Sequence, residues 1–364
     1  MKLDELPTPS LLVDLDRMER NIAAMAATFA DAGLALRPHV KTSKCWEVAR
    51  RQLDAGAVGF TCSTPAEVAW LRGKGVADLL WAHAPVGPRK VGFAVSAARD
   101  GGLTVALDSL DAGRPLSDAA AAAGVTVPFV LEVNTGHARL GVDPDRAVAT
   151  AAALAALPGL SLRGVLTHEG HVSLESDRGS LERAGAAAGA LLVSVAESLR
   201  TAGHDAALVS VGSTPGVTSA PFAAGVTEGR PGTYVYFDAN QTRLGSCTLD
   251  RCALTVLGTV LTVRPDGRVI TDAGVKAMSS DSIGAVGSVG VVCDLDGVPL
   301  PGVTFFDGNE EHGFLLDAGE KRLAVGDLVR LVPNHACGTT NMWSRVVPVR
   351  DGVALAAWSI EARH

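Results

Sequence analysis

Several features that define other protein classes are missing from this chain. Its longest apolar stretch, residues 184–196, lies between Arg183 and Glu197 and is too short to span a bilayer. Residues 1–7 lack the basic-then-apolar order of a signal peptide. The six cysteines form no CxxC pair, and a chain of 364 residues does not need disulfides, so reduced thiols are expected. Together these absences predict a soluble cytoplasmic protein.

Basic residues are outnumbered by acidic ones, 32 to 39. The formal net charge of -7 argues against nucleic acid and against an anionic membrane surface as partners. What the chain does have is core-forming material, because 47% of its residues are hydrophobic. A chain of this length is predicted to form two domains, or one barrel with a smaller partner domain.

The first two-thirds of the chain alternate β-rich runs with alanine-rich helical stretches. The eight runs are Ala35–Val40, Ala57–Thr61, Asp78–Ala82, Leu103–Leu107, Val127–Val133, Leu162–Thr167, Ala207–Val211 and Thr233–Phe237. Such alternation implies parallel strands joined by right-handed crossovers. Eight units in roughly 200 residues predict a TIM-type (β/α)8 barrel over residues 18–240. An open doubly wound sheet would need a GxGxxG turn after the first run, and none is present.

The pattern changes after about residue 240. Valine-rich runs now alternate with turns, and Asp-Gly pairs at 266–267, 296–297 and 351–352 are hairpin signals. These features predict a C-terminal all-β domain over residues 241–364. The run Ser10–Asp14 has no partner among the eight barrel runs, so we assign residues 1–17 to the same β domain.

Lys41 directly follows the first barrel run. A lysine in this position can form a Schiff base with a carbonyl cofactor when desolvation or a cationic neighbour activates its amine. His39 and Lys44 are candidates for that neighbour. Taken alone, the position is more typical of a solvated lysine at a strand end.

Other polar side chains follow the later barrel runs. Catalytic groups of such barrels come from the carboxyl ends of the strands. Gly212-Ser213-Thr214 follows the seventh run and Gly232 adjoins the eighth, where backbone N–H groups of these barrels hold a phosphate. In the β domain, His335 and Cys337 lie two residues apart, and on an extended segment they would point to one side. Imidazole and thiolate suit Zn²⁺, and two protein ligands leave room for water or substrate.

Taken together, these motifs make the chain similar to a known family. It resembles the fold-type III pyridoxal-phosphate enzymes of the D-serine dehydratase / D-threonine aldolase group, relatives of alanine racemase. The matching stretches run in order along the chain at residues 8–14, 37–42, 132–136, 139–142, 167–171, 212–215, 230–234, 272–274, 311–313 and 333–337.

The resemblance implies a role for each residue. Lys41 would carry pyridoxal phosphate, with Arg139 and His168 beside its ring. The phosphate would be bound by Ser213, Thr214, Gly232 and Tyr234. His335 and Cys337 would hold a divalent metal near the substrate's β-hydroxyl, with Zn²⁺ expected first and Mn²⁺ or Mg²⁺ as alternatives. The resemblance also implies a homodimer.

The resemblance further indicates the reaction. Dehydratases of this family tend to carry His-x-Cys at the metal and aldolases His-x-Asp, so the expected activity is dehydration and deamination of a D-3-hydroxy amino acid to a 2-oxo acid and ammonia. Retro-aldol cleavage to glycine and an aldehyde is the alternative, and a non-catalytic cofactor-binding protein is a second one. A racemase of this fold uses a tyrosine of the β domain as second base. The chain has only Tyr234 and Tyr236, both in the eighth barrel run.

Overall fold

The computed structural model describes residues 1–281, 287–319 and 322–363, and it divides the chain into two compact units. The barrel unit comprises residues 26–41 and 52–232. The β unit comprises residues 1–25, 42–51 and 233–363. Residues 42–51, which the sequence analysis placed inside the barrel domain, therefore belong to the β unit.

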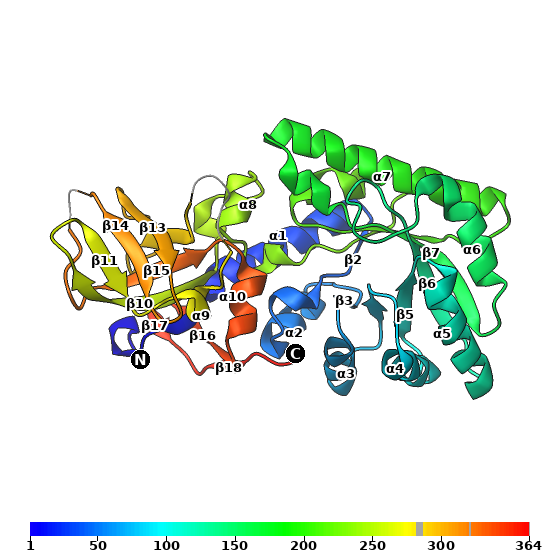
Figure 1. Cartoon of the computed structure of the whole chain (residues 1–364), viewed down its shortest axis with the longest axis horizontal. Helices are drawn as coiled ribbons and strands as arrows, with labels where there is room; N and C mark the ends of the chain where they lie inside the picture. Colours follow the sequence, from blue (N-terminus) through cyan, green and yellow to red (C-terminus); the bar gives the residue numbers. More distant parts are fainter. Residues whose placement is uncertain (282–286, 320–321, 364) are drawn as a thin grey trace. The chain divides into compact units, whose positions relative to one another are not determined.

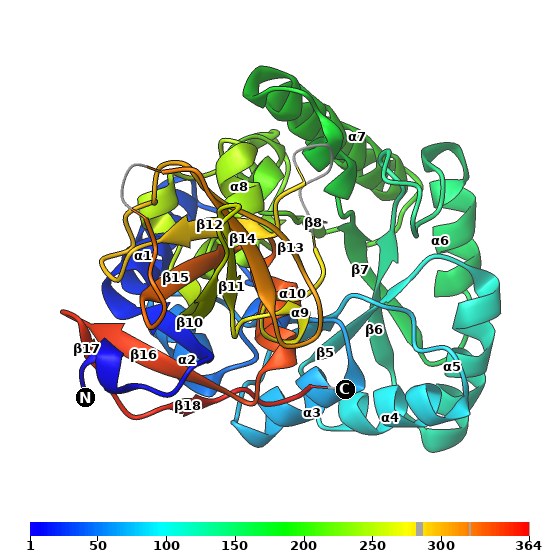
Figure 2. The same ribbon diagram turned by 60° about the vertical axis from the view of Figure 1, so that its left-hand side comes forward.

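Eight parallel strands form the sheet of the barrel unit. They are β2 (Ala35–Leu36), β3 (Phe60–Cys62), β4 (Leu79–Trp81), β5 (Leu103–Leu107), β6 (Val127–Glu132), β7 (Leu160–Leu166), β8 (Leu208–Val211) and β9 (Glu228–Gly229), in the order β2-β9-β8-β7-β6-β5-β4-β3. Backbone hydrogen bonds of 2.9 Å from Val58 to Leu36 and from Thr61 to Pro38 join the two ends of this order. The strands thus close into the predicted barrel. Figure 2 shows β5, β6 and β7 with helices α4, α5 and α6 on their outer side.

The first and eighth strands differ from the sequence prediction. The run expected over Ala35–Val40 is a strand only to Leu36, because Pro38 has no N–H to donate, and a 3₁₀ turn, η2, covers Val40–Thr42. The run Thr233–Phe237 is not the eighth strand, since Thr233–Val235 forms another 3₁₀ turn, η7. The eighth position is taken by Glu228–Gly229, which pairs with both β2 and β8.

Helices cover the outside of the barrel strands (Figure 1). They are α3 (Pro65–Gly73), α4 (Pro88–Arg99), α5 (Leu110–Ala123), α6 (Ala147–Ala155) and α7 (Arg178–Thr201), whereas α1 (Leu15–Asp31) and α2 (Trp46–Asp54) flank β2 in the sequence. Side chains cap the N-termini of α3 and α7: the Thr64 side chain accepts a hydrogen bond from the Glu67 N–H, and the Asp177 side chain accepts one from the Ser180 N–H. No helix within the described residues is long and apolar enough to cross a bilayer.

The β unit is built on a ten-stranded sheet, in agreement with the predicted all-β domain. Its strands are β1 (Ser10–Asp14), β10 (Leu254–Val263), β11 (Arg268–Thr271), β12 (Gly290–Cys293), β13 (Val303–Gly308), β14 (Gly313–Asp317), β15 (Leu328–Pro333), β16 (Arg345–Arg350), β17 (Val353–Ala354) and β18 (Trp358–Ser359). Because β10 pairs with both β11 and β15, the strands β10, β11, β14, β13, β12 and β15 form a closed antiparallel ring.

Two local predictions for the β unit are confirmed. Strand β1 pairs with β10 and with β16, so the N-terminal run does belong to this sheet. The Asp-Gly pairs at 266–267, 296–297 and 351–352 each connect antiparallel neighbours, namely β10 and β11, β12 and β13, and β16 and β17. Short helices α8 (Ala239–Arg243), α9 (Val275–Met278) and α10 (Ala336–Met342) complete this unit.

A network of buried charges links β2 to neighbouring strands of the barrel. Arg37, which follows β2, donates to Glu228 of β9 at 2.7 Å and to Asp78 at 2.8 and 2.9 Å. The Glu228 side chain is only 2% exposed. Its second oxygen accepts from the Ser210 hydroxyl of β8 at 2.6 Å. Glu228 therefore links β2, β8 and β9 through its side chain as well as its backbone.

We expect Glu228→Ala to lower the free energy of unfolding by about 3–5 kcal/mol, because Arg37 would be left as a buried charge with only its exposed partner Asp78. Urea denaturation followed by circular dichroism measures this change. Glu197→Ala, which removes an exposed glutamate of α7, is the matched control and should change stability by less than about 0.5 kcal/mol. Equal effects of the two substitutions would show that the network does not stabilise the barrel.

Candidate active site

Lys41 lies in η2, five residues beyond the end of β2. Its backbone N–H donates to His39 Nδ1 at 3.3 Å, and His39 Nε2 is 3.1 Å from the Ser63 hydroxyl. Burial, followed by the charge of Lys41, holds the pKa of His39 well below its usual range. His39 is therefore neutral and does not supply the cationic neighbour that the sequence analysis considered. Lys44, the other candidate, belongs to the β unit, where its Nζ donates to Asn341 at 3.1 Å.

His168 follows β7 and is held by the neighbouring strand. Its Nδ1 is hydrogen-bonded to the carbonyl oxygen of Gly212, directly after β8. Burial lowers the pKa of His168 to about 3, so the ring is neutral. A carbonyl oxygen can only accept, so Nδ1 carries the hydrogen and Nε2 keeps its lone pair. The His137 ring stands edge-on to it, with centroids 5.5 Å apart.

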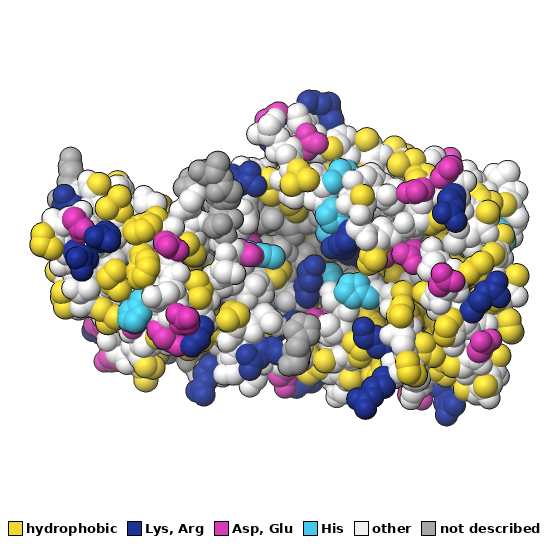
Figure 3. Space-filling model, viewed as in Figure 1, with side chains coloured by type: hydrophobic (Ala, Val, Ile, Leu, Met, Phe, Trp, Pro, Cys, Tyr) yellow, Lys and Arg dark blue, Asp and Glu magenta, His cyan; other side chains and the backbone are white. Residues whose placement is uncertain are grey.

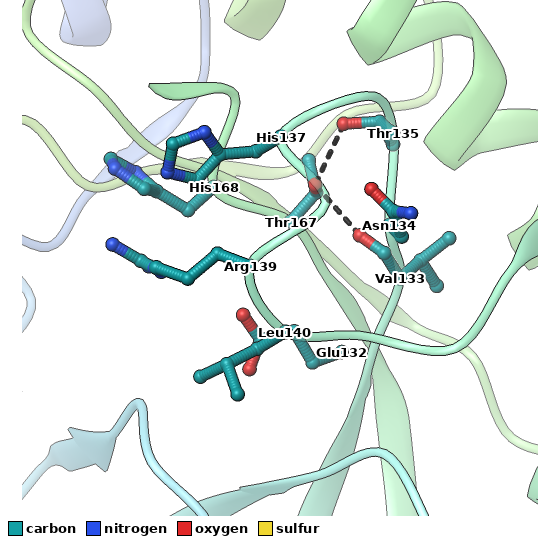
Figure 4. Close-up of a pocket in the computed structure, with 9 residues that line it drawn as sticks. All are labelled: Glu132, Val133, Asn134, Thr135, His137, Arg139, Leu140, Thr167 and His168. Carbon is teal, nitrogen blue, oxygen red and sulfur yellow. Dashed lines mark hydrogen bonds between the residues drawn. The ribbon is translucent and has the colours of Figure 1, made fainter. Parts of the chain in front are cut away.

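The loop after β6 presents Arg139 on the same side as these two histidines (Figure 4). Asn134 shapes this loop, because its Oδ1 accepts from the N–H groups of Gly136 at 3.1 Å and Ala138 at 3.0 Å. A pocket opens here, and burial raises the pKa of Glu132 in its wall to about 7 although Arg230 and Arg139 lower it. The lining residues are Glu132, Val133, Asn134, Thr135, His137, Arg139, Leu140, Thr167 and His168.

The candidate phosphate loop follows β8. Ser213 and Thr214 are buried, and the Gly216 N–H donates to the Ser213 hydroxyl at 3.0 Å. Gly232 belongs to the same unit, whereas Tyr234 is a fully buried residue of the β unit. Since carboxyl ends of parallel strands meet at one end of a barrel, Lys41, Arg139, His168, Ser213 and Thr214 all lie at that end. Histidine and basic side chains are seen gathered on one part of this unit's surface in Figure 3.

The donor set at this end of the barrel fits pyridoxal phosphate. Lys41 offers an amine, Arg139 a cation, and His168 a neutral ring. Two buried polar atoms, Glu169 Oε1 and His171 Nδ1, have no hydrogen-bond partner among the described residues. Buried orphan atoms of this kind are uncommon and mark places where a ligand or water supplies the partner.

The candidate metal ligands lie in the β unit at the start of α10. The sequence analysis placed His335 and Cys337 on one extended segment, but only His335 is extended, and Cys337 lies in the first turn of the helix that His335 caps. The Cys337 side chain nevertheless raises the pKa of His335 to about 10, with help from Asp238 and Asp281 and against the effect of burial. The pair therefore comes together through a helix start rather than through strand alternation.

Three residues that sequence reasoning missed hold this pair in place. His335 Nδ1 is 2.6 Å from Asp281 Oδ2, the Cys337 sulfur is 3.1 Å from the Thr42 hydroxyl, and Asp238 accepts from the Ala336 N–H at 2.9 Å. An imidazole whose Nδ1 faces a carboxylate is oriented to bind a metal through Nε2. No group of three or more His, Cys, Asp or Glu side chains with metal-binding geometry occurs in the parts of the chain that the structure describes.

Comparisons with known proteins identify the family of the chain. The family model described as "Alanine racemase, N-terminal domain" matches residues 13–240, and the one described as "Putative serine dehydratase domain" matches residues 253–349. A D-threo-3-hydroxyaspartate dehydratase of Delftia sp. is 39% identical over 92% of this chain and 92% of its own. A D-threonine aldolase of Arthrobacter sp. is 33% identical over 99% of this chain and 94% of its own. A solved structure of D-threo-3-hydroxyaspartate dehydratase, a cysteine-to-alanine mutant in the metal-free form, superposes with a TM-score of 0.93 at 35% identity, covering 99% of this chain and 98% of that one.

The tautomer of His168 can be measured directly. We expect ¹⁵N–¹H correlation spectra at pH 5 to show a neutral ring with hydrogen on Nδ1, because its pKa lies near 3 and Gly212 accepts that hydrogen. A short unstructured peptide with one histidine is the control, and its ring should be largely protonated at the same pH. A doubly protonated His168 at pH 5, or a hydrogen on Nε2, would contradict the geometry.

Proposed function

This chain belongs to the family of pyridoxal-phosphate-dependent lyases that join an alanine racemase N-terminal domain to a serine dehydratase domain, and we propose that it dehydrates and deaminates a D-3-hydroxy amino acid. The products would be a 2-oxo acid and ammonia. The observation that carries this proposal is the His335–Cys337 pair, in which His335 contacts Asp281 and Cys337 contacts Thr42. The proposal includes a homodimer and a cytoplasmic location.

The cofactor would be held at the carboxyl end of the barrel strands. Bound there, pyridoxal phosphate withdraws electrons from the substrate's Cα. Lys41 would hold it covalently, Arg139 and His168 would lie beside its ring, and Ser213, Thr214 and Gly232 would bind its phosphate. Tyr234 would complete the phosphate site. Because His168 is neutral, it can orient the ring without adding a second positive charge beside Arg139.

The metal would be held by His335 and Cys337. Thiolate and imidazole donors favour Zn²⁺, with Mn²⁺ or Mg²⁺ as alternatives. Such an ion polarises a hydroxyl group, which helps it to leave from Cβ. The contact of Asp281 with His335 Nδ1 supports this assignment, since Nε2 is left for the ion. The solved D-threo-3-hydroxyaspartate dehydratase described as a cysteine-to-alanine mutant in the metal-free form supports it too.

The chain's own residues then account for the proton transfers. The Lys41 amine would take the proton from Cα when the substrate's amine binds the cofactor. The hydroxyl on Cβ would leave as water, taking up one proton in place of the one that Lys41 removes, which gives an enamine. The enamine tautomerises, takes up one water and releases ammonia, so that one water is lost and one gained. The resemblance to lyases of D-3-hydroxy amino acids predicts that the D-enantiomer is consumed.

Retro-aldol cleavage is the second candidate function. The similarity to the Arthrobacter D-threonine aldolase favours it, at 33% identity over nearly the whole chain. Here a base would remove the proton of the β-hydroxyl, and the Cα–Cβ bond would break to give glycine and an aldehyde. The His-x-Cys pair, in place of His-x-Asp, favours dehydration. A non-catalytic carrier would need only the barrel, whereas this chain also has the complete β unit with its ligand pair.

The reaction type is tested by product analysis. With D-serine, D-threonine and D-threo-3-hydroxyaspartate as substrates, we expect at least one to yield ammonia and a 2-oxo acid in equal amounts. The L-isomers should be inert, because the named relatives act on D-amino acids. If glycine and an aldehyde are the main products, the protein is an aldolase and the dehydratase proposal is wrong. Equal turnover of the D- and L-isomers would contradict both proposed reactions.

The metal requirement is tested by Cys337→Ala. We expect it to lose bound metal, measured by plasma mass spectrometry, and to lose about 100-fold or more of the activity. Cofactor absorbance and circular dichroism should persist, because Lys41, which would hold the cofactor covalently, is unchanged. Cys247→Ala removes another half-buried thiol and is the matched control. Full activity in Cys337→Ala, or in metal-free wild-type protein, would show that the pair is structural.

A further inference from the structure

One residue of the barrel unit is buried beneath the candidate phosphate loop without a role in the chemistry above. Glu169 is 1% exposed and follows His168 after β7. Its Oε2 accepts from the Gly212 N–H at 3.0 Å, while its Oε1 has no partner among the described residues. A buried carboxylate with one oxygen unsatisfied costs free energy, and so calls for a compensating function.

Glu169 and His168 together fix one residue of the loop. Gly212 donates its N–H to Glu169, and its carbonyl oxygen accepts from His168 Nδ1. The ladder between β7 and β8 extends to this point, because the Thr167 N–H still donates to the Ser210 carbonyl at 3.0 Å. Two consecutive side chains therefore continue the pairing of β7 and β8 by one residue and set the direction in which Ser213 and Thr214 leave the strand.

The same carboxylate also reaches the far end of the loop. A Cβ added to Gly216 would lie 2.9 Å from Glu169 Oε1 and 3.0 Å from the Ser213 hydroxyl. Gly216 is thus packed directly onto the carboxylate, with its N–H on Ser213. Glu169 spans the loop from Gly212 to Gly216, and no side chain fits between them.

Charge near the loop is balanced by a buried arginine. Arg230 is 5% exposed and packs against Gly212, where an added Cβ would lie 2.8 Å from Arg230 Cβ. Its guanidinium donates to the Ser210 hydroxyl at 2.5 Å and to the Thr167 carbonyl at 2.6 Å. The negative charge of Glu169 therefore faces a fixed positive charge, which leaves the loop free to offer hydroxyl and N–H groups to an anion.

From these contacts we propose that Glu169 is a positioning residue, which sets the loop Gly212–Gly216 in the conformation that binds a phosphate monoester. The inference rests on the proposed role of this loop in cofactor binding. It predicts that Glu169 contributes to the affinity for pyridoxal phosphate and not to the affinity for pyridoxal, which has the same ring and aldehyde but no phosphate.

The test is a titration of cofactor-free protein with each of the two compounds, followed by absorbance. In Glu169→Ala we expect the affinity for pyridoxal phosphate to fall about tenfold or more, with pyridoxal affinity unchanged within twofold, because a charge-assisted hydrogen bond to the loop is lost. Glu169→Gln keeps an acceptor for the Gly212 N–H and should stay within about threefold of wild type. Glu197→Ala, on exposed α7, is the control and should match wild type.

Glu169→Asp covers the case in which the alanine variant does not fold. Its carboxylate is one methylene shorter and cannot reach both Gly212 and Gly216, so it should also lose preference for pyridoxal phosphate. A wild-type preference retained in the aspartate or alanine variant would overturn the inference, as would an equal loss of affinity for both compounds. Wild-type protein that shows no preference for pyridoxal phosphate over pyridoxal would instead overturn the proposed cofactor site itself.

Discussion

The parallel pairing of the eight barrel strands is the constraint on which the site depends. It collects the segments after β2, β6, β7 and β8 at one end of the ring, although the segments after β2 and β8 are more than 170 residues apart in the sequence. At the two-residue strands β2 and β9, the buried contact of Arg37 with Glu228 adds a side-chain link to the backbone pairing. Without the parallel pairing, the residues after β2 would not share an end with those after β8.

Burial then determines the charge state of the residues at this end. His39 and His168 are both kept neutral, and each is held through Nδ1 by a backbone group. The positive charges that remain are those of Lys41, Arg139 and Arg230. A site with neutral rings and fixed cations suits an anionic cofactor whose ring must stay electron-poor. In the β unit the opposite holds, since Cys337 and Asp281 favour the protonated form of His335.

Sequence reasoning found the elements whose signal is local. Lys41 follows the first β-rich run, and Ser213 and Thr214 come directly after Gly212. The Asp-Gly pairs mark hairpins. Each of these signals can be recognised within a few residues. It missed β9, because Glu228–Gly229 is short and polar and is defined by a partner 191 residues away. It missed Asp281 for the same reason, since 54 residues separate it from His335. Glu169 was visible as part of a motif, but its role depends on Gly212 and Gly216, which only the folded chain brings to it.

Covalent mapping of the cofactor tests the central claim most directly. Borohydride fixes pyridoxal phosphate to the lysine that holds it, and peptide mass spectrometry of the reduced protein identifies that lysine. The account predicts the label on Lys41, and loss of visible cofactor absorbance in Lys41→Ala. A label on Lys44 or Lys276, both in the β unit, would contradict it.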